Sequence, residues 1–119
     1  MENGLKENVV KMKSFAFALR VVKLAKYLQS EKGEYVLSKQ VLRSGTAIGA
    51  LIREAEHAQS KADFVSKMSI ALKEANETEY WIDLLHQSKY IGATDYKSIH
   101  PDIEELLKLL TSIVKTSRE

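Results

Sequence analysis

The chain has 119 residues and a net charge of +2, with 45% hydrophobic and 29% charged residues, one proline and no cysteine. This length and apolar content predict one folded domain over residues 1–119, because two half-sized cores would each bury too little apolar surface, and they exclude a disordered chain. The missing cysteines exclude disulfides and thiolate metal sites, and the lack of both an export signal and an apolar run of about 20 residues predicts a cytoplasmic protein that does not enter a membrane.

The first predicted element is a helix over residues 5–30. Five apolar residues keep to one face of it at about 100° per residue, namely Val10, Phe17, Val21, Leu24 and Leu28. The Glu-Lys-Gly-Glu stretch at 31–34 then ends the helix, because glycine suits a C-terminal turn.

The same helix carries more apolar surface than one bundle core requires. A second group lies roughly opposite the first and consists of Met12, Phe15, Leu19 and Val22. Leaving such side chains in water forgoes about 25 cal/mol per Å2 and favours aggregation, so we expect copies of the chain to associate and cover them. The alternative is that a wide core or scattered exposure accommodates them.

A second helix is predicted over residues 35–57, and its distinctive feature is a run of small residues. These are Ser44, Gly45, Thr46, Ala47, Gly49 and Ala50. Glycine in a helix costs about 1 kcal/mol relative to alanine, so we expect the thin surface to allow close approach of a neighbouring helix. The alternative is a loop that divides two shorter helices.

A third helix is predicted to start near Ser60 and to run to about Tyr90. Ser60 and Asp63 resemble a capping box with aspartate in place of the usual glutamate. Apolar residues then occupy a broad arc of this helix, which is too wide for an element with one dry side.

The fourth helix follows residues 92–95, which supply a stop and an N-cap candidate, and it reaches about Lys115. A proline deep in a helix costs about 3 kcal/mol, so we place Pro101 at the first position of the main fourth helix. The alternatives are a short turn before the proline or a helix that kinks there. Four helices joined by short connections predict an all-α fold, an antiparallel up-and-down four-helix bundle.

Basic residues concentrate in the first helix, where residues 1–30 hold six Lys or Arg against two Glu. We predict that Lys13, Arg20, Lys23 and Lys26 form a strip that binds RNA or DNA. Every subunit of an assembly would repeat this strip, so modest phosphate contacts would add through multivalency. The alternative is a solvated charged face, because no interleaved aromatic residues indicate base stacking.

Two arginines lie next to the run of small residues. Arg43 and Arg53 are predicted to pair with carboxylates of the same chain or of another subunit, the candidates being Glu54, Glu56, Glu74, Glu77 and Glu79. Glu79 continues an apolar spacing, so we expect it to be partly buried and to need a partner. Arg43, Arg53 and Glu79, together with Phe15 and Val22, are the candidates for oligomer-interface or structural contacts.

The sequence offers one pattern for metal chemistry. Glu54 with His57, and Asp83 with His86, each place a carboxylate and an imidazole three residues apart on one helical face, as in di-iron carboxylate centres. Such a centre also needs carboxylates from the other two helices, and the first helix has none between residues 8 and 30. No hydrolase triad or glycine-rich phosphate loop is indicated either, so we predict no enzyme activity, no cofactor and no metal site.

The middle of the chain resembles a known family. The resemblance rests on residues 43–55, RSGTAIGALIREA, then Ser60 and Phe64, and then KMSIALKE at 67–74 and ETEYW at 77–81. These segments are similar to the bacterial four-helix-bundle proteins encoded by intervening sequences in 23S ribosomal RNA genes, and to the accessory proteins of diversity-generating retroelements. Many relatives carry Asn-Ile-Ala-Glu-Gly where this chain has Leu-Ile-Arg-Glu-Ala at 51–55.

The resemblance implies a closed bundle that assembles as a ring, a homopentamer, without established catalytic residues. It also implies a role in binding nucleic acid or a nucleic-acid enzyme. We therefore predict a non-enzymatic, ribosomal-protein-like homo-oligomeric scaffold that contacts RNA, DNA or a nucleoprotein through its basic face. The alternative function is a protein–protein interaction module with no nucleic-acid role.

Overall fold

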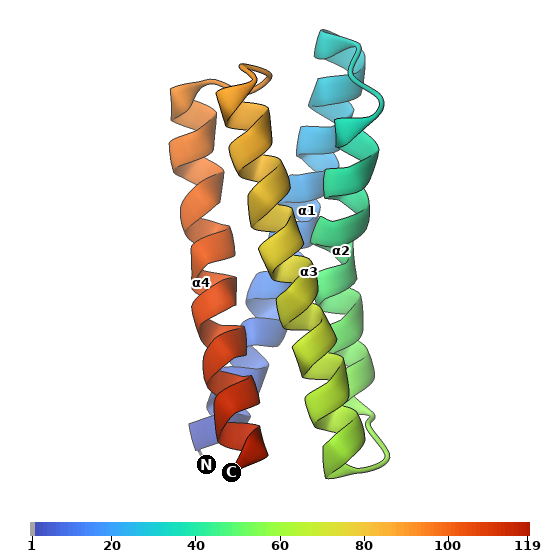
Figure 1. Ribbon diagram of the computed structural model, residues 1–119, viewed down its shortest axis with the longest axis vertical. Coiled ribbons are helices and arrows are strands. Elements are labelled where there is room, and N and C mark those ends of the chain that lie inside the picture. The colour runs from blue at the N-terminus through green and yellow to red at the C-terminus, as the bar shows by residue number, and fades with distance from the viewer. Residues whose placement is uncertain (1) are drawn as a thin grey trace.

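The computed structural model describes the backbone of residues 2–119 and the side chains of residues 4–119. It contains four helices, α1 (Glu2–Lys32), α2 (Leu37–Glu56), α3 (Lys61–Gln87) and α4 (Ala93–Arg118). The chain runs up α1, down α2, up α3 and down α4, so the two labelled ends lie at the same end of the molecule (Figure 1). The predicted all-α, antiparallel up-and-down four-helix bundle is confirmed.

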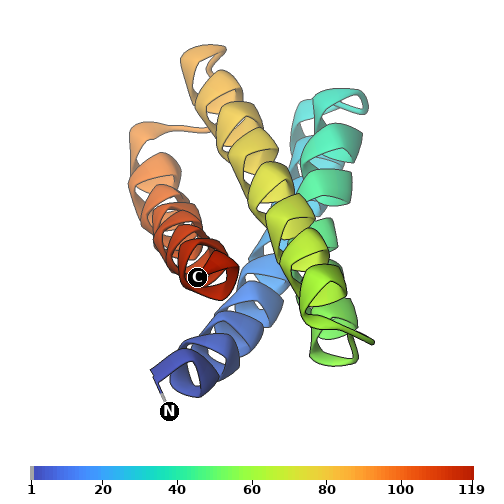
Figure 2. The same ribbon diagram turned by 60° about the horizontal axis from the view of Figure 1, so that its bottom comes forward.

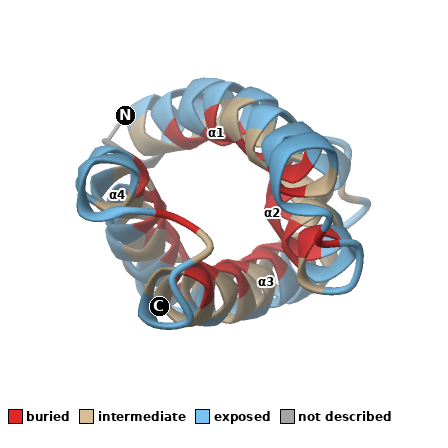
Figure 3. Ribbon diagram, turned by 90° about the horizontal axis from the view of Figure 1, so that it is seen from above, coloured by how far each residue is buried: buried red, intermediate tan, exposed pale blue. Residues whose placement is uncertain are grey.

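The helices form a closed ring of neighbours. Each packs against the next in the sequence and α4 returns to α1, whereas within the described chain the backbones of diagonal helices do not come as close to each other. Seen along the bundle, the buried residues of all four helices face inward (Figure 3). The α1–α4 contact is the smallest of the four, and α1 is inclined to α4 so that the two helices are close near the chain ends and diverge toward the α3–α4 loop (Figure 2).

The inner face of α1 is the apolar face that the sequence indicates. Val10, Phe17, Val21 and Leu28 are all buried and join the central core. At about 1.5 Å per residue, the 31 residues of α1 span about 46 Å, close to the 44 Å length of the molecule. One helix therefore extends along the whole bundle and presents its outer face over the same length.

The small residues of α2 allow α1 to approach closely. A Cβ atom built on Gly45 would lie 2.8 Å from both Cγ1 and Cγ2 of Val21, whereas one built on Gly49 would lie 3.5 Å from Ser14 Oγ. Because α2 is continuous from Leu37 to Glu56, the alternative of a loop at this point is wrong. The predicted close approach is confirmed, and the approaching helix is α1 of the same chain.

The α1–α2 connection is held by one glycine and one carboxylate. Gly33 has a φ of 61°, where a side chain would be strained, and the next residue, Glu34, donates its N–H to the Leu28 carbonyl at 2.9 Å. The Glu34 carboxylate is buried and accepts the N–H groups of Val36 at 3.2 Å and Ser38 at 2.8 Å. Burial raises the pKa of Glu34, but the backbone N–H donors at the start of α2 lower it more, and the net pKa lies below the ordinary value.

The start of α3 confirms the predicted cap. Ser60 Oγ accepts the N–H of Asp63 at 3.0 Å, and Asp63 Oδ2 accepts the N–H of Gln59, rather than that of Ser60, at 3.2 Å. At its other end α3 stops at Gln87, earlier than predicted, because Lys89 takes a left-handed φ of 68°. These caps supply partners for backbone groups that helix ends leave unpaired.

Pro101 does not begin the fourth helix, and that prediction is wrong. The helix starts at Ala93, with Gly92 as its N-cap and no side-chain cap, and Pro101 lies inside it. Tertiary contacts hold the turns before the proline, since Ile99 is buried in the core and the Tyr96 hydroxyl donates to Asp83 Oδ1 at 2.6 Å. Their stabilisation outweighs the backbone hydrogen bond that proline cannot make.

Candidate assembly and nucleic-acid surfaces

The outer face of α1 carries the exposed apolar group that the sequence predicts. Met12 is 73% exposed, and Phe15 and Leu19 are each 53% exposed, whereas Val22 is half-buried. The guanidinium of Arg53 lies 5.3 Å from the centre of the Phe15 ring, within the range of a cation–π contact. We call Met12, Phe15 and Leu19 the outer apolar face of α1.

Two members of the predicted basic strip are engaged with α4. Lys13 Nζ lies 3.0 Å from Glu105 Oε1, and Arg20 Nη1 lies 2.7 Å from Asp102 Oδ2. Arg20 also donates to the carbonyl and the hydroxyl of Ser98, at 2.9 and 2.7 Å. Periodicity did not reveal these pairs, because it does not fix how α1 and α4 are rotated toward each other.

The other two members of the strip remain available. Lys23 and Lys26 are exposed, and neither forms an ion pair with any residue that the structure describes. Their charges are therefore not compensated by close carboxylates, unlike those of Lys13 and Arg20.

Arg43 on α2 pairs with two carboxylates on the neighbouring helix α3 of the same chain. Its guanidinium contacts Glu77 and lies 3.3 Å from the Glu74 carboxylate, both on α3. Trp81 Nε1 donates to Glu77 Oε2 at 2.9 Å, and the Trp81 hydrogen bond and Arg43 together lower the pKa of Glu77. The contact joins α2 to α3 on a partly exposed surface, where an ion pair contributes at most about 1 kcal/mol.

Glu79 belongs to a polar cluster between α3 and α4. Glu79 Oε2 lies 3.3 Å from His100 Nε2, and Glu104 lies 3.3 Å from His100 Nδ1. Tyr96 stacks between His86 and His100, with ring centres 4.1 and 4.9 Å apart. The hydrogen bond from Tyr96 to Asp83, together with burial and nearby carboxylates, raises the pKa of Tyr96 to about 12. The sequence offered a signal in the four-residue spacing of Tyr96 and His100, but not the position of α3 opposite.

The paired carboxylate and histidine patterns do not converge. Glu54 and His57 are exposed at the end of α2, whereas Asp83 and His86 lie near the end of α3, at the opposite end of the bundle. Among the described residues, no group of three or more His, Cys, Asp or Glu has an arrangement that could hold a metal ion. None of the helices, within that same part of the chain, is long and apolar enough to cross a membrane.

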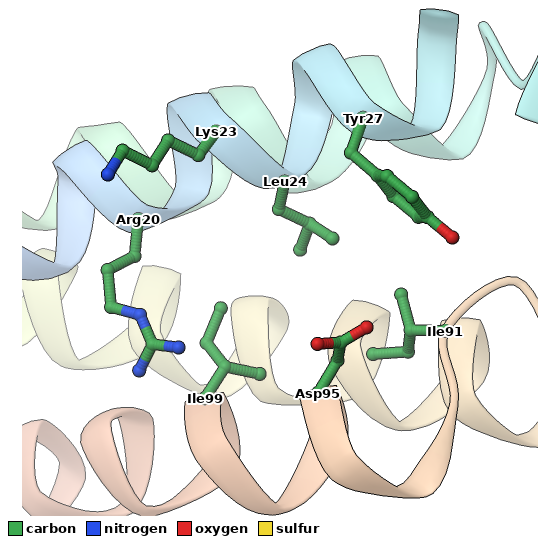
Figure 4. Close-up of a pocket in the computed structure, with 7 residues that line it drawn as sticks. All are labelled: Arg20, Lys23, Leu24, Tyr27, Ile91, Asp95 and Ile99. Carbon is green, nitrogen blue, oxygen red and sulfur yellow. The ribbon is translucent and has the colours of Figure 1, made fainter. Parts of the chain in front are cut away.

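A groove of about 350 Å3 opens where α1 and α4 diverge. Leu24, Ile91 and Ile99 provide its apolar part, and Ile91 and Ile99 are buried. Figure 4 shows Lys23 and Arg20 at one end of the groove and Tyr27 and the Asp95 carboxylate toward the other. No sequence pattern indicated a binding role for Tyr27 or Asp95, because only the divergence of the two helices brings them to one opening.

These features define a helical-bundle protein with an exposed apolar face, free cations beside it and a small groove. Residues 6–112 match the sequence model of the 23S rRNA-intervening sequence protein family, and the chain belongs to this family. A crystal structure of a protein with unknown function from the S23 ribosomal protein family of Bacteroides thetaiotaomicron VPI-5482 is 61% identical, with a TM-score of 0.90. The similarity covers 92% of this chain and 98% of that one. No curated protein matches the chain significantly.

Proposed function

We propose that this chain is a non-enzymatic, cytoplasmic scaffold that assembles with copies of itself through the outer apolar face of α1 and contacts RNA or DNA through neighbouring lysines. The observation that carries the proposal is the combination on one helix of large exposed apolar side chains with the uncompensated cations Lys23 and Lys26. A surface of this kind supports both self-association and attraction of a polyanion.

The outer apolar face supports the assembly step. Three large side chains in successive turns of α1 are each more than half exposed, and burying them recovers about 25 cal/mol for every Å2 of apolar area. Association in a closed ring covers such a face in every copy without leaving an open end. Five copies is the number that the family resemblance implies.

The lysines support the nucleic-acid step through multiplicity. One subunit offers Lys23 and Lys26 as free cations, which is too few for tight binding. A ring repeats them in every subunit, so each further contact to the same strand forms at a high effective concentration. Binding of this kind depends steeply on salt.

Native mass spectrometry of wild type and two charge variants tests the assembly. We expect wild type to be oligomeric and Leu19→Glu to be monomeric, whereas Lys73→Glu, which reverses the charge of an exposed polar residue on α3, should keep the wild-type oligomeric state. A wild-type monomer at micromolar concentration would refute the assembly.

Fluorescence anisotropy with labelled single-stranded RNA and duplex DNA tests the nucleic-acid contact. Lys23→Glu and Lys26→Glu should each weaken binding and reduce the dependence of log K on log salt. Lys73→Glu is the matched control, since Lys73 is exposed on the diagonal helix α3 and the net charge changes equally. Reversing Lys13 or Arg20 is less informative, because it also breaks their ion pairs with α4.

A protein partner is the second candidate function, and the outer apolar face is the observation that favours it. We propose a nucleic-acid enzyme as the partner class to test, because the residue pattern at 43–81 resembles that of the accessory proteins of diversity-generating retroelements. Absence of RNA and DNA binding at low salt, together with an intact assembly, would favour a protein–protein interaction module over the nucleic-acid scaffold.

A further inference from the structure

We infer that the groove between α1 and α4 holds one unpaired nucleotide, with a preference for cytidine over uridine. This inference rests on the proposed nucleic-acid contact and assigns it a site and a chemical selectivity. Three properties of the groove carry it: an apolar floor beside an aromatic ring, free cationic charge at one end, and a carboxylate that no described residue engages at the other.

The floor fits one flat ring. Leu24, Ile91 and Ile99 form a surface between the two helices, and Tyr27 stands at its edge, 37% exposed. The volume of about 350 Å3 is near the lower limit for small-ligand pockets, so it admits a single base rather than a stack of several. Aromatic and aliphatic side chains bind the face of any base and do not by themselves select one.

The cationic end fits a phosphate. Lys23 is exposed and forms no ion pair with the rest of the described chain, so its ammonium can contact a phosphate without breaking an internal contact. Arg20 lies at the same end but is paired with Asp102 and hydrogen-bonded to Ser98, so Lys23 is the cation available to a phosphate there. A nucleotide on the floor would place its backbone toward Lys23 (Figure 4).

The acidic end selects the base. The Asp95 carboxylate points from α4 into the groove toward α1, and no described residue donates a hydrogen bond to it (Figure 4). An ionised carboxylate only accepts hydrogen bonds, and the amino group of cytosine is the donor that aspartate and glutamate recognise on a base edge. Uracil presents a carbonyl oxygen at the corresponding position, which repels the carboxylate.

Other ligands match fewer of these features. A simple anion would use Lys23 and leave the apolar floor in water, and an acidic peptide would bring carboxylates toward Asp95. An aminopyrimidine nucleotide combines a flat apolar ring, an anionic group and a hydrogen-bond donor in one molecule. The charge pattern from Lys23 to Asp95 is therefore complementary to cytidine phosphate.

The test compares fluorescein-labelled eight-nucleotide oligocytidylate and oligouridylate RNA by anisotropy at low, fixed salt and neutral pH. Wild type should bind the cytidine strand at least roughly fivefold tighter, the discrimination expected for one good polar contact to a base. Asp95→Asn should abolish this preference, since asparagine can donate as well as accept. Tyr27→Ala should weaken both strands by roughly fivefold or more, whereas Tyr80→Ala, which removes an exposed tyrosine from α3, should not.

A second measurement locates the ligand without relying on variants. Cytidine 5′-monophosphate should shift the methyl signals of Leu24, Ile91 and Ile99 in a methyl-labelled sample and leave that of Ile70 on α3 unchanged. If Lys23→Glu and Lys26→Glu still weaken binding, the proposed scaffold stands. The nucleotide groove would then be overturned by equal binding of the two strands. It would also be overturned if Tyr27→Ala had no effect and no methyl signal of the groove shifted. Failure of every strand to bind wild type at low salt would overturn both.

Discussion

The contact between Gly45 and Val21 leads to a stability prediction for two alanine substitutions on one helix. Replacing glycine by alanine inside a helix gains about 1 kcal/mol from the restricted backbone of the unfolded chain. At Gly49 the new Cβ meets Ser14 at ordinary contact distance, so Gly49→Ala should raise the free energy of unfolding by about 0.5–1 kcal/mol.

Gly45→Ala should have the opposite effect. Its Cβ would lie 2.8 Å from both methyl groups of Val21, which is fully buried and, being β-branched, has almost no freedom at χ1 in a helix. Overpacking of this kind costs about 1–3 kcal/mol, so after the helical gain the net loss is about 1 kcal/mol. The two variants should therefore differ by about 2 kcal/mol although the chemical change is identical.

Equilibrium urea unfolding followed by circular dichroism measures this difference, at one protein concentration because association also stabilises the fold. Val21→Ala alone should cost about 2 kcal/mol, but combined with Gly45→Ala it should cost about 1–2 kcal/mol less than the sum, since it removes the methyl groups that clash. Gly45→Ala as stable as Gly49→Ala would refute the close α1–α2 packing.

Three further predictions concern the caps and the polar cluster. Ser60→Ala should lower the free energy of unfolding by about 1 kcal/mol in the same urea assay, because the N–H of Asp63 loses its acceptor. Glu34→Ala should lower the free energy of unfolding by about 1–2 kcal/mol at neutral pH. Because folding lowers the pKa of Glu34, the stability that its carboxylate contributes is present above the ordinary pKa of 4.5 and is lost as pH falls through the folded pKa. Urea curves at decreasing pH should therefore show a shrinking difference in stability between wild type and this variant. The pKa of Tyr96 is raised to about 12, so the stability that its protonated hydroxyl contributes is present below the ordinary pKa of 10.0 and is lost as pH rises toward 12. Ultraviolet difference titration should show Tyr96 ionising late, and Asp83→Asn should shift this ionisation to lower pH.

Local patterns predicted the buried face of α1 and the N-terminal cap of α3 well. The spacing of Val10, Phe17 and Val21 gave the buried face of α1, and Ser60 with Asp63 gave the start of α3. These features depend on residues within a few positions of one another, for which helical geometry alone determines the outcome.

Features that depend on two helices at once were predicted less well. Two members of the basic strip, Lys13 and Arg20, are paired because carboxylates of α4 face α1. No local pattern indicates how α4 is rotated toward α1. Pro101 shows the same limit, since the turns before it are stabilised by core contacts of Ile99 rather than by local propensity. The groove went unpredicted because it exists only where α1 and α4 separate.

In the two ion pairs between α1 and α4, the basic and the acidic residue could exchange helices. Lys13 with Glu105, and Arg20 with Asp102, face each other across two antiparallel helices, so exchanging the members of a pair keeps the attraction and the composition while moving a positive charge from one helix to the other. Cohesion of the bundle and the external electrostatic potential of α1 are thereby separable quantities. Variants with exchanged pairs would change the electrostatic potential that an approaching polyanion meets at α1 without altering the net charge.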